Sequence, residues 1–381
     1  MFTSRSVIIL GAGASIDYGL PTGKQLWDQI VADCPHMATK YREAFRDAVV
    51  TNSDGYIRSL RDSEPKAFAY FTILRGEGNN LDERARELAQ AVGDRNMHPN
   101  VDEFLRDNSS LKPVIQVLIA GNLFERLYHR KDDKWTLRER LFATTHESIR
   151  TAPAKENWIR QFVGLCRGRL LETERFRRLT VVSFNYDRLM ETLLREFWNR
   201  GENQYPKFDE CIEFVYPYGA FSALEKIIQD PGRWILEQAK NLSPAGADNT
   251  RDTIIARTEM DRADQIFLLG FSCSDTNMRL LEFHARYGAK TFAQNYDNLD
   301  EHLERVLTTM GARSDKGSML QLVRNGFFKQ SGPAAADPRQ TQAAITLRPR
   351  LTSTGSGNRK IAMSAFGQIR HIPARSRNSP L

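Results

Sequence analysis

Cysteine is scarce in this sequence and is never closely paired. Cys34, Cys166, Cys211 and Cys273 contain no C-x-x-C step, so neither a disulfide framework nor a zinc ribbon is indicated. No apolar run approaches the roughly 20 residues that cross a bilayer. The first apolar stretch, residues 7–10, is too short for a secretory signal. These absences exclude an integral membrane protein, and we expect a cytoplasmic protein without a metal.

Acidic residues are nearly missing from the C-terminal tail. Residues 330–381 carry eight basic side chains and one acid, Asp337, which equals the whole formal net charge of +7. Residues 1–329 are therefore formally neutral, so a basic groove in the folded body is not indicated. Ser, Gly, Pro and Ala dominate after residue 313. We expect one domain over 1–312 and a basic, disordered tail over 313–381. Nucleic acid would be contacted only through this tail or through a partner.

Three segments share one pattern, in which a short β-branched run meets an abrupt polar turn and then helical spacing. The runs are residues 6–10, 179–184 and 265–269. Runs that are apolar on both faces are typical of a parallel sheet covered by helices. Between the first two lies a mainly helical stretch, about residues 25–175, which includes 135–149. The sequence predicts an α/β fold, with a Rossmann-like, mostly parallel sheet and a large helical insertion.

The turns that follow these runs are rich in glycine and short polar side chains. They are residues 11–15, 185–187 and 270–275, and helical spacing continues over 278–285. Parallel sheets bind ligands at the carboxyl ends of their strands. Gly-x-Gly allows a tight turn and close approach to a pyrophosphate, with the amides of the following helix facing the phosphate. All three turns are predicted to converge on one crevice.

The glycine turn departs from the dehydrogenase fingerprint. Ile16 stands where the third glycine would fall, and Asp33 follows a helix-like stretch where a second strand would be needed. An oxidoreductase that uses NAD(P) or flavin is therefore disfavoured.

Taken together, the turns point to a family. Residues 11–23 (GAGASIDYGLPTG), 183–187 (SFNYD) and 269–275 (LGFSCSD), in that order, resemble the sirtuin-like (SIR2-like) domains of bacterial anti-phage defence proteins. The resemblance spans roughly residues 5–290. It implies a Rossmann-like domain that binds NAD+ and hydrolyses it to nicotinamide and ADP-ribose as a defence effector. The alternative is a catalytically weak subunit that binds NAD or ADP-ribose for regulation or assembly.

The resemblance also implies roles for individual residues. Asn185 and Asp187 would lie beside the nicotinamide ribose. The pyrophosphate would be held by Gly11, Ala12, Gly13 and Ser15, and the adenosine half by Gly270, Ser272 and Asp275, with Asp17 as a further binding residue. Cleavage leaves an oxocarbenium-like ribose, which needs a nearby carboxylate and a group that holds hydroxyls or water. Structural roles stay open for Asp187 and Asp275 as helix caps, Asn185 as a turn residue and Ser15 as a packing residue.

Histidine is missing where the family usually places one, some 30 to 40 residues after the Asn-x-Asp turn. No histidine lies between 147 and 283, and Tyr216 or Tyr218 stands in its place. A tyrosine with a pKa near 10 is protonated at pH 7, so it can donate or relay a hydrogen bond but is a poor general base. His98 is expected in a surface loop before a helix cap at Asn100, and His284 is expected to be solvated or packed.

No second folded domain is predicted after the core. Because related defence effectors are fused to or paired with a sensor, the resemblance implies a homo-oligomer with a sensor or activator in trans, such as a HerA-type ATPase. No residue selects among such partners.

Overall fold

The computed structural model describes residues 4–40, 61–76, 81–93, 100–138, 141, 158–172, 178–200, 205–244, 250–295 and 301–329. Its centre is a six-stranded sheet in which every pairing is parallel. The strands, in spatial order, are β5 (Ile212–Val215), β4 (Leu179–Ser183), β1 (Ser6–Leu10), β7 (Gln265–Leu269), β8 (Thr291–Asn295) and β9 (Arg313–Lys316).

The strand order defines the fold class. Counted within this sheet, the order is 3-2-1-4-5-6, the arrangement of Rossmann folds, and the order reverses between β1 and β7. The predicted α/β, Rossmann-like class is therefore confirmed. The register pairs Ser6 with Gln265 and Val7 with Thr180. All five residues of β1, β4 and β7 are buried, which explains why apolar side chains point to both faces of these strands.

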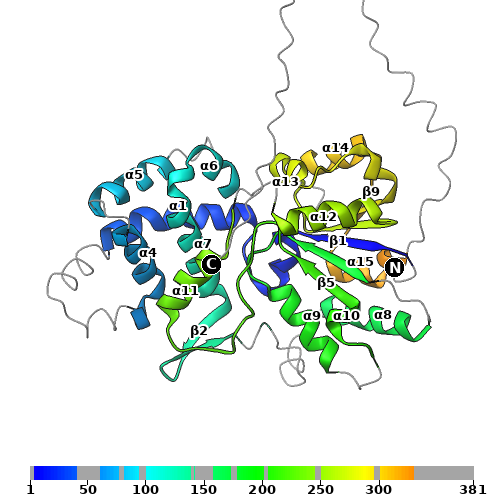
Figure 1. Cartoon of the computed structure of the whole chain (residues 1–381), viewed down its shortest axis with the longest axis horizontal. Helices are drawn as coiled ribbons and strands as arrows, with labels where there is room; N and C mark the ends of the chain where they lie inside the picture. The colour runs from blue at the N-terminus through cyan, green and yellow to red at the C-terminus, as the bar shows by residue number, and fades with distance from the viewer. Residues whose placement is uncertain are drawn as a thin grey trace, which may run out of the picture. The chain divides into compact units, whose positions relative to one another are not determined.

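Helices cover both faces of the sheet. Figure 1 shows α12, α13 and α14 on one side of the strands and α8, α9, α10 and α15 on the other. Their bounds are α8 (Trp158–Glu172), α9 (Leu189–Asn199), α10 (Phe208–Cys211), α12 (Arg251–Arg262), α13 (Asp275–Leu280), α14 (Glu301–Met310) and α15 (Met319–Arg324), with short 3₁₀ segments η5 (Ala285–Lys290) and η6 (Phe327–Lys329).

The described part of the stretch between β1 and β4 is mainly helical, as the pattern predicts. Its elements before α8 are η1 (Ala12–Tyr18), α1 (Gly23–Lys40), α4 (Pro65–Gly76), α5 (Leu81–Gly93), α6 (Val101–Asp107), η2 (Ser109–Leu111), α7 (Lys112–Leu127) and the hairpin β2 (Tyr128–Lys131) and β3 (Lys134–Leu137). Later in the chain, β6 (Ile227–Ile228) pairs with β3, and α11 (Pro231–Lys240) packs on α4 and α7.

The hairpin corrects one helical prediction. Helical spacing was expected over 135–149, but residues 134–137 form β3, and 142–150 lie outside the described residues. The cause is the two-residue turn before β3, where Asp132 and Asp133 have φ of 49° and 58°. Two consecutive positive φ values are what a type I′ hairpin turn requires.

The expected helix over 278–285 is shorter than its spacing suggests. Helix α13 ends at Leu280, and Glu282 turns the chain with a φ of 49° before η5 begins at Ala285. The left-handed residue breaks the α-helical hydrogen bonding, so apolar spacing alone overestimates the helix.

The folded core continues past residue 312, where composition placed its end. Residues 313–316 form β9, an edge strand of the sheet. Beyond it, Phe327 and Phe328 are buried, and their ring centroids lie 5.5 and 5.1 Å from that of Phe267 in β7. The polar composition of this segment therefore gave no indication of β9 or of the two buried phenylalanines that follow it. The basic residues of 330–381 lie outside the described residues.

Within the described ranges, no helix combines the length and apolar character that a membrane span requires. The four cysteines are free and buried.

Candidate functional site

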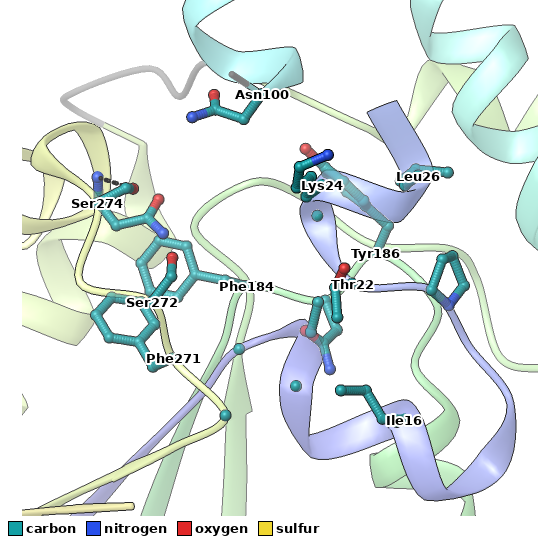
Figure 2. Close-up of a pocket in the computed structure, with 18 of the residues that line it drawn as sticks. Ile16, Thr22, Lys24, Leu26, Asn100, Phe184, Tyr186, Phe271, Ser272 and Ser274 are labelled. Carbon is teal, nitrogen blue, oxygen red and sulfur yellow. Dashed lines mark hydrogen bonds between the residues drawn. The ribbon is translucent and has the colours of Figure 1, made fainter. Parts of the chain in front are cut away.

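A cavity of about 750 Å³ opens at the carboxyl ends of the strands. It lies where the strand order reverses, which is the usual ligand position in an open α/β sheet, and its volume falls in the range of small-molecule sites. Figure 2 shows Phe271, Ser272 and Ser274 on one side, Thr22 and Lys24 on the other, and Asn100 nearby. The residues predicted for the site that line it are Gly11, Ala12, Gly13, Asp17, Asn185, Asp187, Tyr218, Gly270, Ser272 and Asp275.

The two glycine turns pack directly on each other. The Gly11 amide donates to Leu269 O at 3.0 Å, and the Gly13 amide donates to Gly270 O at 3.0 Å. A Cβ atom at Gly13 would lie 2.8 Å from Gly270 Cα, so a side chain there would force the turns apart. The glycines thus hold two strand ends together. Their own amides are already paired with backbone carbonyl groups, so neither is available to a ligand.

The segment after the glycine turn also differs from the expected α-helix. Residues 12–18 form the 3₁₀ helix η1, which ends at Gly19 with a φ of 78°. The first long helix, α1, begins at Gly23, and its start lines the cavity. The Thr22 side chain accepts from the Gln25 amide at 3.1 Å, and the Gln25 side chain accepts from the Thr22 amide at 2.9 Å. This is a capping box. The T-x-x-Q pattern at 22–25 could have located this helix start from sequence.

Asn185 connects the second turn to the first. Its Nδ2 donates to Ser15 Oγ at 3.0 Å across 170 residues of sequence. Ser15 itself is buried behind the cavity wall, so it reaches the site through Asn185. Asn185 is only 5% exposed, and its Oδ1 has no hydrogen-bond partner within the part of the chain that the structure describes. A buried acceptor without a donor is costly in a folded protein. Asn185 Oδ1 is therefore suited to accept from a hydroxyl or amide of a ligand.

Asp187 ends the same turn and is also buried. Its Oδ1 accepts from the Leu189 amide at 2.8 Å at the start of α9, so it has the capping contact left open by the sequence. Burial raises the pKa of Asp187 to about 6, while hydrogen bonds from the Leu189 and Asp187 amides oppose the shift. The carboxyl group can therefore exist in either protonation state near neutral pH.

The raised pKa predicts a specific pH dependence of stability. Since folded Asp187 binds a proton more tightly than unfolded Asp187, its contribution to the free energy of unfolding falls as pH rises from about 4 through 6. The burial costs about 3 kcal/mol at neutral pH. We expect Asp187→Asn to remove this dependence and to be more stable than the wild type at pH 7. Thermal and denaturant unfolding between pH 4 and 8 measures both effects.

Asp17→Asn is the matched control for this experiment. Asp17 lines the same cavity but is exposed. Its replacement should leave the pH profile between 4 and 6 parallel to that of the wild type. A parallel profile for Asp187→Asn would instead contradict the buried, shifted carboxyl group.

The structure separates the two candidate tyrosines. Tyr218 lines the cavity, and its hydroxyl donates to Asn277 Oδ1 at 2.6 Å. Tyr216 does not line it, and its hydroxyl donates to Glu191 Oε2 at 2.8 Å. Tyr218 is therefore the tyrosine that can contact a ligand. The ring of Phe184 meets that of Tyr218 edge to face at 5.1 Å, which fixes its orientation.

The third turn supplies a different cap from the one considered. Ser274, not Asp275, caps α13, because its side chain accepts from the Asn277 amide at 3.4 Å. Asp275 is the first helical residue. Gly270 has a φ of 57°, and its amide donates to Gln294 Oε1 at 3.2 Å. Gln294 lies at the end of β8 and lines the cavity, although no sequence pattern had marked it.

The helical insertion also reaches the cavity. Asn100 caps α6 as expected, accepting from the Glu103 amide at 3.0 Å, and residues 100–103 line the wall. Asp102 hydrogen-bonds Tyr186 of the second turn, so it joins α6 to the Asn-x-Asp segment. Sequence reasoning missed these residues because their proximity depends on how the insertion packs.

The charge of the lining is unbalanced. Lys24 is the one cationic side chain among the described lining residues, and it pairs with Asp28 at 2.8 Å. The acidic side chains of the lining are Asp17, Asp102, Glu103, Asp187 and Asp275. The cavity therefore favours ligand groups that are cationic or that donate hydrogen bonds.

Neither histidine considered earlier contributes a base to the described lining. His98 lies outside the described residues, and His284 is exposed and stacks with Tyr287. Within the described ranges, no three His, Cys, Asp or Glu side chains are grouped in a way that could hold a metal ion.

The geometry defines an α/β protein of the Rossmann-like class with a cavity at the switch point of its sheet. No family model matches the chain, and no curated protein matches it in sequence.

Proposed function

We propose that this protein is an NAD+ hydrolase that releases nicotinamide and ADP-ribose. The observation that carries the proposal is the buried Oδ1 of Asn185, which lies in the wall of a cavity formed by all three turns and has no partner among the described residues. A ribose hydroxyl is a suitable donor for this oxygen. NAD+ carries one positive charge on its nicotinamide ring and two negative charges on its pyrophosphate. The acidic lining suits the nicotinamide end alone, and the pyrophosphate would have to lie at the start of α1 with Lys24.

Hydrolysis breaks the bond between ribose C1′ and the nicotinamide nitrogen, which keeps the electron pair. Water oxygen then bonds to C1′, and one proton is released. Positive charge builds on the ribose as the bond breaks, so the Asp187 carboxylate beside it would lower the barrier. Asn185 would hold a ribose hydroxyl. Water reacts readily with such an electron-poor carbon and needs little deprotonation. Most of the lowering of the barrier would therefore come from positioning and electrostatics.

Tyr218 would act as a hydrogen-bonding residue. Its hydroxyl donates to Asn277 Oδ1 at 2.6 Å, and this bond would hold the cavity-lining side chain in place beside the ligand. This arrangement also favours the second candidate function, a subunit that binds NAD or ADP-ribose without efficient turnover, because no histidine is available among the described lining residues.

Product detection separates the two candidates. We expect nicotinamide and ADP-ribose to appear by mass spectrometry when the chain is incubated with NAD+, alone or with its native partner. Binding of NAD+ without product in both conditions would reject the hydrolase and support the binding subunit. Absence of binding would reject both.

The wider biological role follows from the resemblance described above. We propose a cytoplasmic effector of an anti-phage defence system, assembled as a homo-oligomer and activated by a sensor protein in trans, with a HerA-type ATPase as one candidate class.

The acidic lining predicts discrimination against an extra phosphate. NADP+ carries two more negative charges than NAD+ near neutral pH, and at low salt these are repelled by the carboxylates of the wall. We expect NADP+ to bind about tenfold more weakly than NAD+ or worse, as measured by calorimetry. The double variant Asp17→Asn/Asp275→Asn should reduce the difference in affinity between NAD+ and NADP+.

Asp132→Asn/Asp133→Asn is the control for this prediction. Both residues lie in the β2–β3 turn, so this double variant removes the same two charges away from the cavity. Its ratio of the two affinities should equal that of the wild type. Equal affinity of the wild type for both dinucleotides would contradict the electrostatic selection while leaving hydrolysis of NAD+ possible.

A further inference from the structure

A charged cluster lies directly behind the Asn-x-Asp turn. Arg188 Nε lies 3.0 Å from Glu191 Oε2, and the Tyr216 hydroxyl donates to the same oxygen at 2.8 Å. The Arg188 guanidinium carbon lies 5.0 Å from the centre of the Tyr216 ring. None of the three lines the cavity. The cluster can therefore influence a ligand only through the turn.

Arg188 has an unusual backbone conformation. Its φ and ψ are 51° and 11°, the left-handed region that residues with a side chain rarely adopt. It stands between Asp187 and Leu189, whose amide donates to Asp187 Oδ1 at 2.8 Å. Relaxation of Arg188 to an ordinary conformation would move this amide, and with it the Asp187 carboxyl group. The left-handed residue therefore sets the geometry of the turn.

Glu191 is well placed to hold that conformation. Its side chain is 15% exposed and contacts two arginines and one tyrosine. Burial and the charge of Glu191 raise the pKa of Tyr216, so its hydroxyl stays protonated and donates. The Tyr216 amide also donates to Asp252 Oδ2 at 3.0 Å, and this bond holds the backbone of Tyr216 in place.

We propose that Glu191 is a positioning residue that keeps Arg188 left-handed and thereby orients Asn185 and Asp187, with Tyr216 as its buried support. This assigns a role to the tyrosine that stands near the missing histidine but does not reach the cavity. The catalytic consequence rests on the proposed NAD+ hydrolysis, whereas the effect on the turn does not.

The critical experiment uses glycine to replace the function of the cluster. Glu191→Ala removes the anchor, and we expect kcat for NAD+ to fall about 10- to 100-fold with a smaller change in KM, since misplacement of reacting groups affects the chemical step. Glycine adopts a φ of 51° without strain. Arg188→Gly in the Glu191→Ala background should therefore recover most of the lost kcat. Arg188→Ala in the same background removes the same unpaired guanidinium but keeps a Cβ atom, so it should not recover kcat. Equal recovery by alanine and glycine would show that relief of the unpaired charge, and not the left-handed backbone, explains the effect.

Two further variants complete the test. Tyr216→Phe keeps the ring beneath Arg188 but loses the bond to Glu191, and it should show a smaller loss. Glu196→Ala removes a carboxylate of the same helix that pairs with Arg200 at the surface, and it should match the wild type. Arg195 stays anchored when Glu191 is removed, because it also pairs with Asp209 at 2.7 Å.

A second measurement does not depend on turnover. The Asp187 carboxyl group gives the free energy of unfolding a pH dependence with a folded-state pKa of about 6. Glu191→Ala should move the midpoint of this pH dependence. Arg188→Gly in the Glu191→Ala background should return the midpoint to its wild-type value. The positioning role would be overturned if Glu191→Ala kept the kcat and the midpoint of the wild type. It would also be overturned if Arg188→Gly in the Glu191→Ala background restored neither quantity. If the wild type binds NAD+ without cleaving it, the proposed hydrolase fails and the midpoint alone decides the role of Glu191.

Discussion

Asn185→Ala is expected to lower kcat/KM for NAD+ by about 100-fold or more, the scale seen when one preorganised polar contact to a transition state is lost. The Asn185 amide combines a fixed orientation, through its bond to Ser15 Oγ at 3.0 Å, with a buried acceptor that has no partner among the described residues. Truncation removes this acceptor and also the bond that links the second turn to the first, so a loss of stability is expected beside the loss of activity. Product formation and the melting temperature should be measured on the same preparation.

Asn122→Ala is the matched control for this loss. Asn122 is a second buried asparagine, which donates to Leu118 O at 2.9 Å within α7 and does not line the cavity. Its truncation should cost stability on the order of 1–2 kcal/mol with kcat/KM close to the wild type. Full activity of Asn185→Ala would place the chemistry elsewhere and remove the main support for the proposed hydrolase.

Gly270→Ala is expected to destabilise the fold by at least about 3 kcal/mol. The added Cβ atom would meet Ala14 N at 2.1 Å and Gly13 C at 2.4 Å, and the φ of 57° already disfavours alanine. The contacts are backbone atoms at the switch point, so no side chain can move aside. Chemical denaturation should show a lower midpoint, and NAD+ binding should be lost as the glycine turns separate.

Gly164→Ala controls for the addition of a methyl group. Gly164 lies within α8, and a Cβ atom there would have no neighbour within 4 Å. Alanine should raise stability by up to about 1 kcal/mol, because it favours a helix over the unfolded chain. Equal midpoints for Gly270→Ala and the wild type would show that the two glycine turns are not packed as described.

The fold class was predictable because burial leaves a direct imprint on short strands. The three apolar runs at the start of each unit match β1, β4 and β7 to within one residue. The wrong predictions occur where a residue with positive φ determines the secondary structure. Asp132 and Asp133 form a hairpin turn where a helix is expected, and Glu282 ends α13 early. Positive φ at residues other than glycine has no reliable sequence pattern.

The candidate site was predictable only in part, for a related reason. Turns that follow parallel strands must meet at one edge, so the proximity of Gly13, Asn185 and Gly270 follows from topology. The contribution of α6 depends on packing of the insertion, and the use of the glycine amides depends on close contact between two turns. The choice of Tyr218 over Tyr216 depends on the turn after β5, in which the Gly219 amide donates to Tyr216 O at 2.9 Å, and sequence spacing alone does not resolve it.

The central position of β1 has a consequence for how the chain is made. Its neighbours β4 and β7 are paired through Val7 with Thr180 and Ser6 with Gln265. During translation, at about 5–20 residues per second, the first strand waits on the order of tens of seconds for its second neighbour. During this time the apolar segment 6–10 would be exposed to solvent unless the helices made after it, or a chaperone, covered it. High contact order of this kind makes folding slow and leaves the newborn chain open to aggregation.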